Sequence, residues 1–189
     1  MKRVFTLLMV FIFTLSAFAD WEYEEKIYAL TYKTFMEEYI ARLERDFNAA
    51  NFNKTNSVIS RLKDLSRLRY QYDTNSHYDT RDILSASISV FETNDYIESF
   101  EISVPISAYF SFMVDGKSFF DFMAERAIKA LNAGWSANDI LWSMRLYRDM
   151  GLLKDQNKNE SESIYVGIYT FTVTRASGRY YFRFDLGFK

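Results

Sequence analysis

The stretch SFEISVPISAYFSFMV at residues 99–114 decides the fold class of this chain. Every even-numbered residue from Phe100 to Val114 is apolar, whereas the odd-numbered residues are largely hydroxylic. Side chains on a β-strand alternate between its two faces, so this pattern predicts a long strand with one face on a hydrophobic core. Pro105 is the only proline. It cannot donate to a strand ladder, which predicts a bulge, an edge position or a break at this residue.

A second strand precedes this stretch. Apolar residues alternate with serines over residues 84–90, and Thr93-Asn94-Asp95 supplies residue types that favour turns. The two segments therefore predict a β-hairpin. Glu98 is even-numbered like Phe100, so on a regular strand both side chains would lie on the buried face. Burial would raise the pKa of the Glu98 carboxyl group. Glu98 is close to the predicted turn, however, where this alternation is a weak guide.

Two amphipathic helices come before this hairpin. Apolar residues recur at helical spacing from Trp21 to Phe47 and form one wide stripe. After an asparagine-rich stretch, Thr55 or Asn56 is placed to cap a second helix that extends to Tyr72. The short connection favours an antiparallel helix pair, and its apolar seam needs a third surface to cover it.

Two further helices follow the long strand. Their start signals are Ser118 with Asp121 and Ser136 with Asp139, which have capping-box spacing, and their end signals are Gly134 and Gly151. The first of these helices is apolar almost all round. We therefore expect it to be the central buried helix, between the sheet and the other helices.

The C-terminal region predicts a second hairpin, with strands at residues 164–174 and 179–188 joined by Arg175-Ala176-Ser177-Gly178. A polar loop at residues 154–163 precedes it. Both faces of this hairpin contain many apolar residues, so either helices cover both faces or a partner covers one. We expect an interaction surface made by Tyr165, Tyr169, Phe171, Tyr181 and Arg183.

These elements together predict an α+β fold. It has an N-terminal antiparallel helix pair and two β-hairpins that form one antiparallel sheet of about four strands. The two later helices lie between the hairpins in sequence and pack on the sheet.

The first 19 residues have the features of an export signal. Lys2 and Arg3 precede an apolar run, and Ala17-Phe18-Ala19 fits the small-x-small cleavage rule, so cleavage is expected before Asp20. The apolar run is shorter than the roughly 20 residues that span a bilayer. We expect residues 20–189 to form a single domain without a transmembrane segment, in the periplasm or outside the cell.

The composition excludes several classes of function. Aromatic residues make up 19% of the chain, yet there is no cysteine and only one histidine, His77, which we interpret as an ordinary loop residue. Motifs of serine hydrolases, zinc proteases and phosphate-binding loops are absent from the sequence, so we predict no catalytic, cofactor or metal site. The net charge of −2, without a long basic run, argues against nucleic acid as a partner.

An aromatic excess without catalytic chemistry, behind an export signal, favours a non-enzymatic cell-envelope protein that acts by association with a protein partner or with further copies of itself. The alternative is a carrier of an apolar small molecule held between the helix layer and the sheet. A hydrolase with two acidic groups is the third hypothesis, with carboxylates drawn from Glu92, Asp95, Glu98, Glu101 and Asp115. If phenylalanine side chains fill the inner face of the sheet, the protein-association hypothesis is favoured. If that face encloses a cavity, the ligand-carrier hypothesis is favoured.

Overall fold

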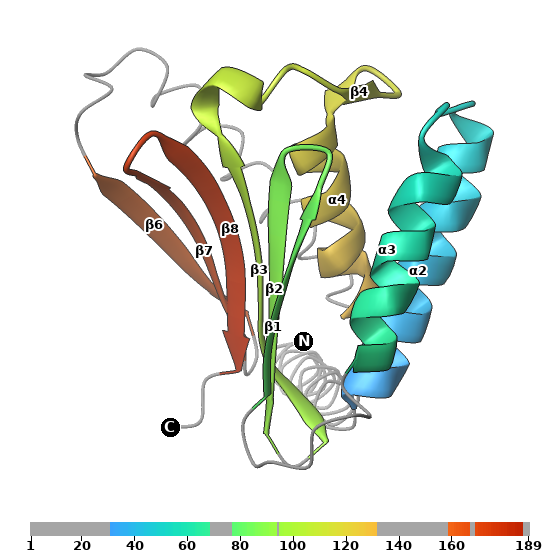
Figure 1. The fold of residues 1–189 in the computed structure, drawn as a ribbon. Helices are drawn as coiled ribbons and strands as arrows, with labels where there is room; N and C mark the ends of the chain where they lie inside the picture. Colours follow the sequence, from blue (N-terminus) through green and yellow to red (C-terminus); the bar gives the residue numbers. More distant parts are fainter. Residues whose placement is uncertain (1–30, 69–76, 94, 132–158, 167–168, 187–189) are drawn as a thin grey trace, which may run out of the picture.

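The computed structural model describes residues 31–68, 77–93, 95–131, 159–166 and 169–186 (Figure 1). The described helices are α2 (Tyr32–Ala49), α3 (Thr55–Leu68) and α4 (Phe119–Ala130). The main-sheet strands are β1 (His77–Ile83), β2 (Ala86–Thr93), β3 (Tyr96–Pro105), β6 (Glu160–Val166), β7 (Tyr169–Ala176) and β8 (Arg179–Leu186). The predicted export signal and the predicted helix after Ser136 lie outside the described residues.

The fold class is α+β with an antiparallel sheet, as the sequence predicts. The strand order is β1-β2-β3-β8-β7-β6, and each neighbouring pair is antiparallel. Strands β3 and β8 pair with each other, which joins the two predicted hairpins into one sheet. The predicted number of about four strands is wrong, because the sheet has six.

Two features of the sheet explain the difference in strand number. The segment of β1, HYDTRDI, is too polar to be recognised as a strand, and His77 begins that strand instead of lying in a loop. The segment taken as one strand at residues 164–174 is two, since β6 ends at Val166 and β7 begins at Tyr169. Gly167 stands between them, and β6 also takes in residues 160–163 of the predicted polar loop.

Pro105 is the last residue of β3, so of the three predicted alternatives, a bulge, an edge position or a break, the structure has the break. A short 3-10 helix, η2 (Ile106–Ala108), follows it. The even-odd pattern then fails, because Tyr109 is buried while Phe110 is 63% exposed. The end of the predicted long strand is instead β4 (Met113–Val114), which pairs with β5 (Lys117–Ser118).

A β-bulge changes the parity at the start of β3. Phe91 pairs with Ser99, but Glu92 pairs with Ile97, so Glu98 is an extra residue in β3. Ile97 is therefore fully buried on the same side as Phe100, and Glu98 is exposed. The interpretation of Glu98 as a buried carboxyl group was wrong for this reason.

The helix pair agrees with the predicted stripe where the structure describes it. The Thr31 hydroxyl accepts a hydrogen bond from the Thr34 amide at 3.2 Å and caps the start of α2. Helix α3 begins at Thr55 itself, whose hydroxyl donates to the Phe52 carbonyl at 2.6 Å. The helices run side by side in opposite directions, joined by a short connection (Figure 1).

Helix α4 is the predicted central helix. The Ser118 hydroxyl accepts from the Asp121 amide at 3.1 Å, as the capping-box spacing predicts, while the Asp121 carboxylate accepts from the Tyr109 hydroxyl. All residues of α4 except Asp121 and Lys129 are buried. Figure 1 shows α2, α3 and α4 on the same side of the sheet, which we call the inner face.

Aromatic rings fill the part of the inner face that lies between α2 and strands β3 and β8. Phe35 and Tyr39 of α2 meet Phe100 of β3 and Phe184 of β8, with ring centroids 5.2–5.6 Å apart, and all four are fully buried. A second group stacks between α2 and α4: Phe47, Phe119 and Phe122. Burial of each such side chain contributes about 1.5–3 kcal/mol, so the first group holds α2 against the sheet and the second holds α2 against α4.

Candidate partner-binding surface

The outward face of the sheet, opposite the three helices, is polar. Its cross-strand neighbours form three rows from β2 to β6: Phe91, Ser99, Asp185, Thr170 and Tyr165; Ser89, Glu101, Arg183, Thr172 and Ser163; Ser87, Ser103, Tyr181, Thr174 and Ser161. Most of these residues have a hydroxyl group, and none is lysine. The same sheet therefore has an inner face with many aromatic side chains and an outward face with mainly hydroxyl side chains.

The structure divides the predicted interaction residues between the two faces. Tyr165 is 77% exposed on the outward face, where Tyr181 and Arg183 also lie, each half-buried. Tyr169 and Phe171 are only 3% exposed, on the inner face. Odd-numbered residues face outward on β6 but inward on β7. The reason is that Val166 pairs with Tyr169, so that Tyr165 pairs with Thr170.

Two arginines of β8 cross the outward face. The Arg179 Nη2 donates to the hydroxyls of Ser103 at 3.0 Å and Ser87 at 3.2 Å, so it extends over β3 to β2. The Arg183 Nε donates to both carboxylate oxygens of Asp185 at 2.7 and 2.8 Å, and its guanidinium carbon lies 5.8 Å from the Phe91 ring centroid. These side chains cover part of β3, where Ser103 is only 5% exposed.

Glu101 lies opposite Arg183 in this arrangement. Its carboxylate is 4.0 Å from the Arg183 guanidinium. Burial raises the pKa of Glu101, and the positive charge of Arg183 partly offsets this effect. Both arginines of β8 therefore interact with acceptor groups that belong to the β2–β3–β8 part of the outward face.

The β6–β7 part of the outward face is more open. Its hydroxyls bond in pairs, Ser161 with Thr174 at 3.0 Å and Ser163 with Thr172 at 2.9 Å. Ser161, Ser163 and Tyr165 are exposed, and β6 is the last strand in the sheet order. Within the described residues, this part combines an exposed aromatic ring with an edge strand.

An ionic cluster joins α4 to α2 and β5 on the helix side. The Glu125 carboxylate accepts from Lys117 at 2.5 Å, Lys129 at 2.7 Å and Arg126 at 2.9 Å, and Arg126 also donates to Asp46 at 3.1 Å. Burial alone would raise the pKa of Glu125, but the hydrogen bonds from Lys117 and Lys129 outweigh it and lower the pKa to about 2. A carboxylate held ionised in this way is unsuited to general acid catalysis. We interpret the cluster as a structural contact.

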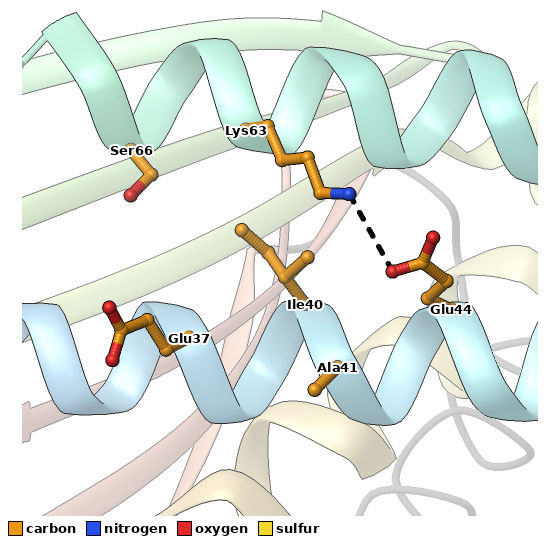
Figure 2. Close-up of a pocket in the computed structure, with 6 residues that line it drawn as sticks. All are labelled: Glu37, Ile40, Ala41, Glu44, Lys63 and Ser66. Atoms are coloured by element: carbon orange, nitrogen blue, oxygen red, sulfur yellow. Dashed lines mark ion pairs between the residues drawn. The ribbon is translucent and has the colours of Figure 1, made fainter.

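A cleft of about 300 Å³ lies between α2 and α3 (Figure 2). Ile40 and Ala41 line its apolar part, and Glu44 is 3.6 Å from Lys63 beside it. Glu37 and Ser66 complete the lining. The cleft is formed by the two helices, so it differs from the ligand position predicted between helix layer and sheet.

The described carboxylates considered for hydrolysis lie in different parts of the fold, with Glu98 and Glu101 in β3, Asp95 in the β2–β3 turn and Asp115 in the β4–β5 turn. Asp95 and Asp115 are exposed at positive φ angles of 70° and 50°, and Glu101 lies half-buried on the outward face. The side chain of Glu92 and that of His77 are outside the described side chains. Among the described residues, no group of three or more histidine, aspartate or glutamate side chains could hold a metal ion.

Comparison with protein-family models, curated proteins and solved structures finds no match for this chain. In the part of the chain that the structure describes, no helix combines the length and apolar character needed to cross a membrane.

Proposed function

We propose that this chain is an exported, non-enzymatic cell-envelope protein that acts by binding another protein through the outward face around Tyr165. The observation that carries the proposal is the 77% exposure of Tyr165 on a face where no described helix lies. Its neighbours on β6 and β7 are serine and threonine, and Tyr181 and Arg183 lie further along the same face.

The chemistry of this face supports protein recognition. Tyrosine and arginine are enriched at binding hot spots, serine supplies adaptable hydrogen bonds, and lysine is depleted. The Arg183 side chain is already held by Asp185, so a partner would not have to order it on binding. Exposed tyrosine and pre-ordered arginine together favour association.

The inner face supports association over carriage of an apolar ligand. Phe35, Phe100 and Phe184 are in mutual ring contact and fully buried, so this part of the inner face has no room for a ligand. Lipid extraction followed by mass spectrometry of the purified protein tests the carrier hypothesis directly. A stoichiometric lipid would favour carriage.

Site-specific cross-linking tests the proposed function. A photoreactive phenylalanine analogue at Tyr165 should give a discrete adduct in cells that make the protein naturally, and excess purified protein should suppress the adduct. The same analogue at Ser60, exposed on α3, is the matched control and should give none. Equal labelling from both positions, or no adduct from Tyr165, would contradict the proposal.

The export part of the proposal has its own test. Mass spectrometry of the protein from fractionated cells should show a mature N-terminus at Asp20 in the periplasmic or extracellular fraction. Recovery of the full chain beginning at Met1 from the cytoplasm would contradict it.

A further inference from the structure

We infer that β6 accepts an extended, basic segment of a protein partner as an additional strand of the sheet. This inference rests on the proposed function and specifies how the partner binds. Its evidence is the position of β6, the exposure of its side chains and the charge of Glu162.

The position of β6 leaves one of its edges available in the described structure. Its seven residues, Glu160–Val166, pair with β7 along one edge, and the sheet order places no described strand on the other. Backbone groups at a strand edge need hydrogen-bond partners, and an added strand supplies them along its whole length. This is the mode of recognition in which main-chain bonds provide affinity and side chains provide specificity.

The side chains of β6 are accessible on both sides of the sheet. Ser161, Ser163 and Tyr165 are exposed on the outward side, and Glu162 is exposed on the inner side. Side chains of directly paired residues on adjacent strands lie about 4.5–5.5 Å apart at Cβ. Side chains on both faces of an added strand would therefore contact side chains of β6.

The charge of β6 selects a basic strand. Glu162 pairs in register with Val173, which offers no charge, and none of the ion pairs in the described structure includes Glu162. A lysine or arginine opposite Glu162 would form a favourable cross-strand pair. Ser161 and Ser163 suit small hydroxyl residues, and Tyr165 suits an aromatic or β-branched residue.

The same charge disfavours a second copy of this chain. Pairing of two β6 strands with Glu162 opposite Glu162 would bring these two carboxylates together on one side of the joined sheet. Like charges at close cross-strand positions are destabilising, and charged edges commonly prevent self-pairing. The negative charge of Glu162 thus attracts a basic segment and also repels the β6 strand of a second copy.

The probe is a fluorescein-labelled peptide, Thr-Tyr-Val-Thr-Lys-Thr-Thr, designed as the antiparallel complement of β6 with its one lysine opposite Glu162. Fluorescence anisotropy with the full chain should show binding at least about fivefold tighter than for the same peptide with glutamate in place of lysine. Glu162→Lys should reverse this preference. Glu37→Lys, at an exposed position on α2, is the matched control and should leave it unchanged.

Backbone methylation separates strand addition from docking by side chains alone. N-methyl groups on alternate peptide residues should abolish binding in one register and leave it unchanged in the other, since only one edge of the peptide faces β6. Equal binding in both registers, no binding of the lysine peptide, or a preference unaltered by Glu162→Lys would overturn the inference. Self-association at β6, detected as concentration-dependent mass that Glu162→Lys abolishes, would also overturn it.

These results are distinguishable from failure of the proposed function. A Tyr165 adduct together with equal binding of both methylated peptides would keep association and remove strand addition. Loss of the adduct would contradict the proposed function whatever the peptides show.

Discussion

The two faces of the sheet use the same strands for different purposes. On β3 and β8, Phe100 and Phe184 point inward and are fully buried, whereas Glu101 and Arg183 on the outward side remain half-buried. Helices cover the inner face, while on the outward face arginines from β8 extend over β3 to β2. Within the described residues, the apolar contacts that stabilise the fold are therefore concentrated on the inner face, whereas the outward face presents mainly polar side chains.

The largest expected effect lies on the inner face. Phe100→Ala should lower the free energy of unfolding by about 3–5 kcal/mol, because it removes ring contacts to Phe35, Tyr39 and Phe184 and leaves a cavity. Urea denaturation followed by circular dichroism measures the change. A loss below about 1 kcal/mol would mean that the rings do not hold the layers together.

The Glu125 cluster should give the next largest effect, also on the helix side. Against the effect of burial, hydrogen bonds from Lys117 and Lys129 lower the pKa of Glu125 from its ordinary value of 4.5 to about 2 in the folded state. Because the folded pKa is lowered, the stabilisation is present above pH 4.5 and is lost as the pH falls towards 2. Its size is about 3 kcal/mol.

Glu125→Gln tests this assignment. The variant should lose about 3 kcal/mol at neutral pH, and it should lose less further stability than the natural chain between about pH 4.5 and pH 2. Glu37→Gln, on the exposed side of α2, should change stability by less than about 0.5 kcal/mol. An identical pH dependence in the Glu125 variant and the natural chain would show that another group is responsible.

Sequence reasoning succeeded where local chemistry and tertiary contacts agree. The stripe of α2, the cap at Ser118 and the break at Pro105 follow from spacing and from the chemistry of single residues. It failed where a long-range pairing decides the outcome. Strand β1 is polar and depends on β2 for its pairing, and the bulge at Glu98 is defined only by its partner strand.

The candidate surface was predictable in part for the same reason. Tyr165, Tyr181 and Arg183 lie on the outward face, but Tyr169 and Phe171 face the core because the parity changes between β6 and β7. The glycine at position 167, between the two strands in the sequence, was the available signal for this change. The acidic edge of β6 was not recognisable as an edge, since strand order is a property of the whole sheet.

On the outward face, Arg179→Ala should have a moderate effect. It removes the hydrogen bonds of a charged guanidinium to the hydroxyls of Ser87 and Ser103 and to the Ser103 carbonyl, so the free energy of unfolding should fall by about 1.5 kcal/mol. Thermal unfolding in parallel with Phe100→Ala measures the difference between the faces. A loss as large as that of Phe100→Ala would show that the outward face also carries the fold.

The smallest expected effect on stability belongs to Tyr165→Ser. The tyrosine ring is 77% exposed, so its removal takes little apolar surface out of a buried environment, and the free energy of unfolding should change by less than about 0.5 kcal/mol. Binding of the lysine peptide should nevertheless weaken by about fivefold or more, because the ring is the largest accessible side chain on β6.

The control variant is Val173→Ala, at a buried position on the neighbouring strand β7. It should lower the free energy of unfolding and leave the peptide affinity unchanged under conditions where the variant is folded. If Tyr165→Ser instead destabilised the fold and left peptide binding intact, the assignment of stability to one face and recognition to the other would fail.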